Sequence, residues 1–176
     1  GGFDRFGIYN YNASITTKVY GILNFKPKNK IQSIRHTITP SISYSNNPSF
    51  EKYYDTYIID ANGNTAEYTR FQGGLYPGPG KNYSSSIGLT IANTLEAKVK
   101  PKDSTETELR KINIFSNLNI STSYNLAAEE FNLSPIRVTG AIDLAPGLKL
   151  NTGATFDPYA LDENNSRINV FNYKNG

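Results

Sequence analysis

Few residues of this sequence could do covalent or metal chemistry, and they stand apart from one another. His36 is the only histidine, and there is no cysteine. A catalytic nucleophile needs a base beside it, and a zinc site needs several thiolates or imidazoles. His36 stands at the start of a segment with strand periodicity, which favours an interface residue over a base or metal ligand. The sequence therefore predicts neither an enzyme nor a bound cofactor or metal.

The segment 73–81, GGLYPGPGK, faintly resembles a phosphate-binding loop. That motif requires glycine where Leu75 stands and serine or threonine where Asn82 stands. Pro77 and Pro79 also remove backbone N–H groups that would otherwise cradle a phosphate. We therefore interpret this segment as a rigid, folded loop.

Two segments rich in carboxylates and amides resemble cation sites only in part. Residues 60–64 open like a calcium-binding loop but lack the remaining EF-hand spacing and its final glutamate. The Asn-Gly pair at 62–63 instead predicts a hairpin turn. The other carboxylates that could hold a cation are Asp157, Asp162 and Glu163. A solvated loop is the simpler interpretation of that second segment.

The charges do not indicate a nucleic-acid partner. The net charge is +3, and the basic residues are not interleaved with aromatic side chains that could stack on bases. One basic turn could contact anionic headgroups or a periplasmic partner, with a solvated turn as the simpler interpretation. Its residues are Lys26, Lys28, Lys30 and Arg35.

The elements that carry these residues are predicted to be strands. Asn, Ser, Thr, Gly and Tyr are abundant, and the mean hydropathy is -0.49. There is no run of about 18 apolar residues that could form a spanning helix, and no signal peptide is recognisable. Apolar residues instead alternate with polar ones, which is the period of a half-buried strand. The segments with this pattern are 13–25, 36–45, 83–99, 112–126, 136–144 and 148–156.

This alternation is typical of barrel strands that face lipid on one side and a lumen on the other. The connections alternate between compact turns and longer loops, of which 46–82 is the longest, as in barrels with periplasmic turns and outer loops. We predict an all-β fold, an antiparallel transmembrane β-barrel segment of about six strands of a larger barrel. The chain, residues 1–176, is interpreted as an internal fragment of one barrel domain in the cell outer membrane.

The barrel interpretation gives individual side chains a place. An aromatic girdle at headgroup level is expected from Tyr44, Tyr83, Tyr124 and Phe156. The side chains expected to face lipid are Ile114, Leu118, Ile120, Leu150 and Ala154. Those expected to face the lumen are Asn113, Asn117, Asn119, Thr139 and Asn151. Within 112–126 only Phe115 breaks the polarity of the lumen face.

Several stretches resemble the C-terminal barrel region of the lipopolysaccharide-assembly family LptD (OstA), in the form found in Bacteroidetes-type bacteria. They follow one another in order along essentially the whole chain. The stretches are 34–44 (IRHTITPSISY), 68–74 (YTRFQGG), 121–128 (STSYNLAA) and 156–164 (FDPYALDEN).

The resemblance implies a large barrel that inserts lipopolysaccharide into the outer leaflet through a gate in its wall. It also implies a plug lipoprotein of the LptE type and periplasmic Lpt components as partners. Proteobacterial members carry cysteines that tie the barrel to a periplasmic domain. This sequence has no cysteine, so it departs from that pattern.

Two other functions remain open at this point. Another outer-membrane conduit, such as a nutrient transporter, fits the strands equally well but not the family-like stretches. A soluble glycan-binding β-sandwich also alternates, but it gives no reason for aromatic residues at one level of one face.

A modification site is expected in one turn. Asp103-Ser104-Thr105 resembles a bacterial acceptor pattern for O-linked glycans and lies in a turn that we place in the periplasm. Ser104 would carry the glycan, with an unmodified solvated turn as the simpler alternative.

Overall fold

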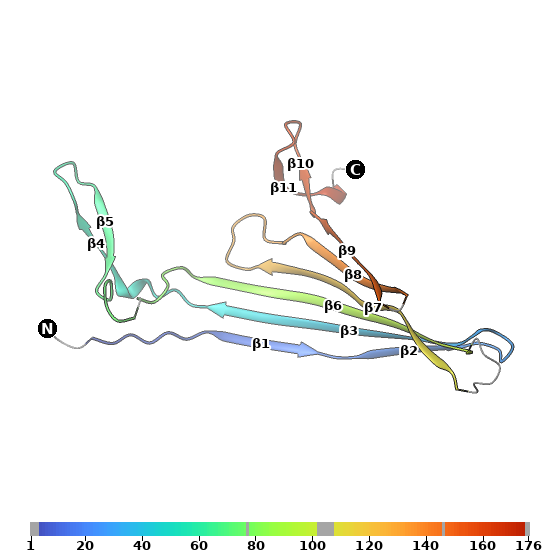
Figure 1. The fold of residues 1–176 in the computed structure, drawn as a ribbon. Coiled ribbons are helices and arrows are strands. Elements are labelled where there is room, and N and C mark those ends of the chain that lie inside the picture. The colour runs from blue at the N-terminus through green and yellow to red at the C-terminus, as the bar shows by residue number, and fades with distance from the viewer. Residues whose placement is uncertain (1–3, 77, 102–107, 146, 175–176) are drawn as a thin grey trace.

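The fold is one open antiparallel sheet with two small hairpins attached to it (Figure 1). The computed structural model describes residues 4–76, 78–101, 108–145 and 147–174. The strands of the large sheet are β1 (Tyr11–Thr16), β2 (Val19–Asn24), β3 (Ile31–Asn47), β6 (Ser84–Val99), β7 (Arg110–Asn125), β8 (Ile136–Ala145) and β9 (Leu148–Phe156). Their order is β1-β3-β6-β7-β8-β9, and β2 also pairs with β3. The predicted all-β, antiparallel fold class is confirmed.

The two hairpins lie at the end of the large sheet where the longer loops leave it, which we call the loop end. β4 (Tyr54–Ile58) pairs with β5 (Thr65–Thr69) after β3, and β10 (Tyr159–Leu161) pairs with β11 (Arg167–Phe171) after β9. Short 3-10 turns, Glu51–Tyr53 and Asn172–Lys174, precede the first hairpin and follow the second. Figure 1 shows both hairpins projecting away from the large sheet.

The predicted strand over 13–25 is interrupted in its middle, and Pro40 explains why. β1 and β2 pair with β3 in one continuous register, with Thr16 opposite Ser41 and Val19 opposite Ile38. Between them the amide of Thr17 donates to the carbonyl of Pro40 at 3.1 Å. Proline has no N–H to donate in return, so the ladder loses a hydrogen bond at this point and the strand is divided in two.

β3 is longer than the predicted strand over 36–45. Its turn with β2 is tight, because the amide of Phe25 bonds the carbonyl of Gln32 at 2.8 Å and that of Asn29 bonds Lys26 at 2.9 Å. The register shifts between Ile31 and Ser33, which marks a bulge in β3. Part of the connection between the predicted strands 13–25 and 36–45 therefore belongs to β3.

β7 carries two irregularities that move Phe115 to the other face. The register slips between the pairs Asn93 with Leu118 and Leu95 with Phe115, and again before Glu96 with Asn113. Each slip adds one residue to β7, and each added residue reverses the alternation of the side chains. Phe115 consequently lies opposite Leu95, on the same face as Ile112 and Leu118. Ile114 lies between the two slips without a ladder partner, so its expected place on the lipid side stays a prediction.

The ladder between β7 and β8 is short and leaves the sheet forked. It runs only from Asn117 opposite Ala141 to Ser121 opposite Arg137. Between the bulges and the β6–β7 turn, β7 stays paired with β6, as far as Arg110 opposite Val99. β8 stays paired with β9. Figure 1 shows β7 diverging from β8 and β9 toward the compact turns.

Both hairpins turn with the same backbone pattern. In each, one aspartate Oδ1 accepts hydrogen bonds from the amides two and four residues later: Asp60 from Asn62 (3.0 Å) and Asn64 (3.0 Å), Asp162 from Asn164 (2.9 Å) and Ser166 (2.7 Å). The residue three places after the aspartate is left-handed, Gly63 at φ 84° and Asn165 at φ 60°, a conformation these two types tolerate. The predicted turn at Asn62-Gly63 is confirmed.

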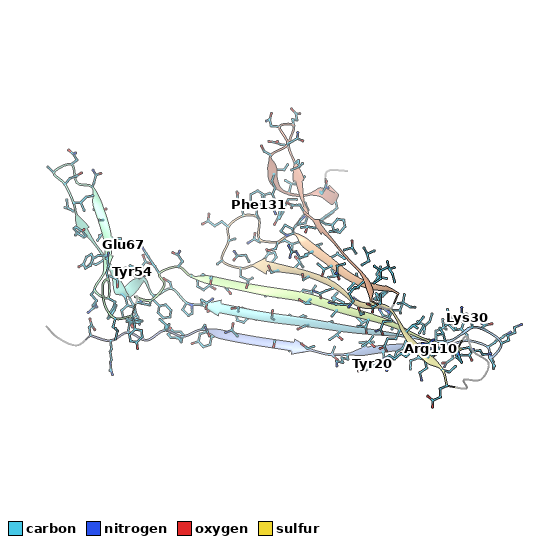
Figure 2. The ribbon with its side chains drawn as sticks, viewed as in Figure 1. Tyr20, Lys30, Tyr54, Glu67, Arg110 and Phe131 are labelled. Atoms are coloured by element: carbon cyan, nitrogen blue, oxygen red, sulfur yellow. The ribbon has the colours of Figure 1, made fainter. Side chains whose placement is uncertain are left out.

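The large sheet has no hydrophobic core of its own. Among the described residues the buried apolar side chains are Phe50, Phe71, Ala97, Tyr159 and Ala160. Of these only Ala97 belongs to the large sheet. The others lie beneath loops and hairpins, where Phe6 packs on Phe71 with ring centroids 4.6 Å apart. The side chains of the sheet extend from a single layer (Figure 2).

Candidate functional site

The register of the ladders shows which side chains share a face, because directly paired residues of an antiparallel sheet point to the same side. One row across the sheet consists of Ala13, Tyr44, Ile87 and Tyr124. Another consists of Pro40, Ile91, Ile120, Val138 and Ala154. These rows belong to what we call the apolar face. It is open, since Ile15 is 78% exposed and Ile42 56%.

An apolar face of this extent requires a cover. Soluble proteins rarely expose contiguous apolar patches larger than a few hundred Å², and this face extends across all the strands of the large sheet. No second sheet lies over it in the part of the chain that the structure describes. A soluble sandwich, in which two sheets cover one another, would need such a layer.

Four of the residues expected to face lipid share the apolar face. Leu118, Ile120 and Ala154 do so through the ladders of β7, β8 and β9, and Leu150 lies opposite Ile142 in the same alternation. Phe115, which the alternation placed on the other face, also lies on the apolar face of β7. No feature of the sequence other than the polarity break at Phe115 indicated this difference.

The opposite face, which we call the polar face, carries every residue expected to line a lumen. Asn117 lies in one row with Ala141 and Asn151, and Asn119 lies in the next with Thr139. Asn113 lies opposite Glu96. Serine and threonine lie on the same face in β3 and β6, as in the pairs Ser41 with Thr90 and Thr37 with Thr94. This face therefore presents mainly hydroxyl and amide groups.

The aromatic residues at the loop end lie on the apolar face. Tyr44 and Tyr124 flank Ile87 in one row, Phe156 lies opposite Ile136, and all are partly exposed. Tyr83 precedes β6, and its hydroxyl accepts a hydrogen bond from the side-chain amide of Asn46 at 3.1 Å.

Sequence reasoning missed two further members of this row of rings. Tyr11 lies opposite Asn46 and is 59% exposed. Tyr9 stacks edge-on against it with ring centroids 5.6 Å apart. The alternation of Tyr9, Tyr11, Ala13 and Ile15 was the signal that could have found them.

A family model described as LptD protein matches residues 1–159 of the chain. The chain belongs to the LptD protein family. Proteins of this family are outer-membrane proteins of lipopolysaccharide transport and assembly, not known as enzymes. No curated protein and no solved structure matches the chain. No helix in the described part of this LptD-family chain is both long and apolar enough to cross a membrane.

The single histidine of this LptD-family chain makes a polar contact on the apolar face. Nε2 of His36 lies 3.1 Å from Oδ1 of Asn93, and the ring of Phe115 packs edge-on at 6.4 Å between centroids. The side-chain amide of Asn93 also reaches the carbonyls of Ile91 and Leu118. His36 thus lies inside β3 rather than at the start of a strand, and contacts Asn93 of β6 and Phe115 of β7.

A charged cluster occupies the polar face near the compact turns. Glu96 receives a hydrogen bond from Nε of Arg35 at 2.9 Å and an ion pair from Lys111 on the other side. The side chain of Glu96 is 16% exposed, whereas those of Arg35 and Lys111 are 49% and 57% exposed. The anion therefore lies beneath two cations that extend into solvent.

The other chemical candidates serve local structure. Both oxygens of Asp60 accept hydrogen bonds within its own turn, and Asp157 pairs with Arg167 at 3.0 Å. Lys81, at the end of the phosphate-loop-like segment, pairs with Glu67 and, at 3.7 Å, with Glu51. Among the described residues no cluster of three or more acidic or histidine side chains is placed to hold a metal. Ser104 lies outside the described residues.

Proposed function

We propose that this chain forms one sector of the wall of an outer-membrane barrel that inserts lipopolysaccharide into the outer leaflet. The observation that carries the proposal is a single-layer antiparallel sheet with an exposed apolar face and a polar opposite face, in a chain of the LptD protein family. The apolar face would contact membrane lipid and the polar face the lumen. Further strands of a larger barrel would pair with the open edges at β1, β2 and β9.

The orientation follows from the lengths of the connections. The compact turns, between β2 and β3, β6 and β7, and β8 and β9, would lie in the periplasm. The loops that carry the two hairpins would lie outside the cell. Tyr9, Tyr11, Tyr44, Tyr83, Tyr124 and Phe156 would then form the outer aromatic girdle.

The wall would act mechanically. Beyond its periplasmic mouth it would separate an apolar route for acyl chains, along the membrane, from a polar route for sugars, along the lumen. Hydroxyl and amide side chains, such as those of Asn117, Asn119 and Thr139, exchange hydrogen bonds with sugars without holding them in one place. The expected partners are lipopolysaccharide, a plug lipoprotein of the LptE type and the periplasmic Lpt components.

Depletion of the full-length protein in cells tests the function. We expect lipopolysaccharide to accumulate before the cell surface, while uptake of small nutrients at first continues. Re-expression of the intact gene should restore surface lipopolysaccharide.

The second candidate, a nutrient transporter, predicts the opposite pattern. If surface lipopolysaccharide stayed normal on depletion while the uptake of one nutrient failed, the transporter would replace the function proposed here.

A further inference from the structure

The polar face contains a hollow with a volume of about 400 Å³. It lies at the end of the sheet where the compact turns connect the strands. It extends over β2, β3, β6 and β7. Its lining includes Ile22, Ser33, Arg35, Glu96, Lys98 and Lys111. Because these residues come from strands in register, their positions are fixed by backbone hydrogen bonds rather than by a loop.

Two of the cations in this hollow oppose each other directly. Lys98 and Lys111 are Cα partners in the ladder of β6 and β7. Like charges directly opposite on one face of a sheet are destabilising. Glu96 pairs with Lys111 and Arg35, and among the described residues Lys98 has no ion pair. One carboxylate thus compensates three cations, and the hollow retains excess positive charge.

The β2–β3 turn adds to this charge. The amide of Lys100 donates a hydrogen bond to the carbonyl of Lys30 at 2.9 Å. This bond joins the β2–β3 turn to the end of β6. Figure 2 shows Lys30 and Arg110 at the same end of the sheet. Lys26 and Lys28 lie in the β2–β3 turn. Among the described carboxylates outside the hollow, Asp60, Glu67, Asp157 and Asp162 lie in the hairpin regions at the opposite end, whereas Glu108 and Asp143 lie at the end of the compact turns.

Apolar side chains adjoin the cations on a face that is otherwise polar. Ile22 lies opposite Arg35 and is 65% exposed, and Tyr20, opposite Thr37, is 59% exposed. Figure 2 labels Tyr20 on the strand that borders the hollow. A cationic hollow edged by exposed apolar groups is suited to a ligand with an anionic head and an apolar body.

We propose that this hollow binds the phosphate group of a phosphorylated amphiphile. Lys98, Lys111 and Arg35 contact the anion, and Ile22 contacts the adjoining apolar part. Bound phosphate relieves the repulsion between Lys98 and Lys111. The proposal rests on the proposed function for the location of the hollow, at the periplasmic mouth of the lumen, and for the glycolipid as the source of the phosphate.

Binding to the full-length protein in neutral maltoside micelles tests the site. The probes are a mono-phosphorylated acyl-glucosamine disaccharide, the same glycolipid without phosphate, short-chain phosphatidic acid and inorganic phosphate. Calorimetry should give roughly tenfold weaker binding of the phosphorylated glycolipid to Lys98→Gln, because a charged hydrogen bond is lost. The Lys98→Arg variant should bind the phosphorylated glycolipid nearly as tightly as the unsubstituted protein does. Lys98→Gln leaves the ion pairs of Glu96 intact, so the fold should be retained.

A matched control uses Lys18, which lies on the same face and outside the hollow. Lys18→Gln should leave the affinity unchanged. Equal losses in Lys18→Gln and Lys98→Gln, or equal binding of the dephosphorylated glycolipid, would overturn the anion site. Inorganic phosphate binding as tightly as the glycolipid would overturn the role of Ile22. Preference for the phosphorylated glycolipid over phosphatidic acid supports the cargo as the source, and the reverse preference supports a phospholipid.

Replacing Ile22 with a photo-crosslinking amino acid, in cells, tests this site independently of the proposed function. We expect a crosslink to lipid, and a crosslink to an acidic segment of a protein instead would overturn the proposal. If Lys98→Gln bound the glycolipid normally while depletion still stranded lipopolysaccharide, only the site would be wrong. If depletion left surface lipopolysaccharide normal, the proposed function would fail regardless of what the hollow binds.

Discussion

Nε2 of His36 donates a hydrogen bond to Oδ1 of Asn93, 3.1 Å away, in the middle of an otherwise apolar face. An amide oxygen only accepts, so the proton lies on Nε2. Asn93 is 8% exposed, and the pair is therefore largely shielded by its neighbours. From Tyr44 to His36 the strand runs about 26 Å, or about 20 Å of depth at a typical barrel tilt. The pair consequently lies within the lipid-facing band in the proposed orientation, at the level of Leu118, which is the ladder partner of Asn93.

Removing one member of this pair should be costly, and removing both should not. Asn93→Ala leaves the ring N–H of His36 without its partner, which we expect to cost about 1–3 kcal/mol in free energy of unfolding. His36→Leu combined with Asn93→Leu replaces both polar groups and should be nearly neutral. Urea unfolding of the full-length protein in liposomes measures both. A double variant as unstable as the sum of the single ones would contradict the pairing.

The two faces of β7 should respond oppositely to charge. Arg at Leu118 places a cation on the apolar face and should cost about 2–4 kcal/mol near the membrane midplane, whereas Arg at Asn119 should cost little. The two positions are neighbours in one strand, so each is the control for the other. Equal destabilisation in a liposome folding assay would argue against the barrel.

The bulges of β7 place residues 113 and 115 on opposite faces, which simple alternation would not predict. The chain has no cysteine, so single cysteines can be introduced in this segment without a background from it. Phe115→Cys should react with a lipid-soluble maleimide and Asn113→Cys with a water-soluble one, although strict alternation puts both on one face. Identical reactivity at 113 and 115 would show that the register continues without the slips.

The turn of the β4–β5 hairpin should depend on the ionisation of Asp60. The side-chain amide of Asn64, with backbone amides of the turn, holds the pKa of Asp60 below its ordinary value of 3.8. Its contribution is therefore fully present above pH 3.8 and is lost as the pH falls through the lowered pKa of the folded turn.

Amide hydrogen exchange checks this dependence. Asp60→Ala should speed the exchange of the amides of Asn62 and Asn64, which it leaves without an acceptor. Asp55→Ala is the matched control, because Asp55 bonds only the adjacent amide of Thr56, at 2.8 Å. Protection at Asn64 that survives both Asp60→Ala and acid would exclude the capping role.

Sequence patterns located the strands well where alternation is strict, as over 148–156, which coincides with β9. They failed where one residue overrides the pattern. Pro40 interrupts its partner strand, an effect that only the pairing reveals. Phe115 moves to the apolar face through bulges, since an aromatic ring is more stable there than among asparagines. The β10–β11 hairpin was missed because its turn, at 162–166, lacks the Asn-Gly pair that revealed 62–63.

The fork in the ladder below Asn117 gives the two ends of the sheet different mechanics. Five residue pairs join β7 to β8, and beyond them two leaves, β3–β6–β7 and β8–β9, each keep their own hydrogen bonds. Either leaf can tilt about that short seam without breaking a bond inside itself. At the loop end the seam thus holds β7 and β8 together, whereas at the end of the compact turns the two leaves are free to move apart.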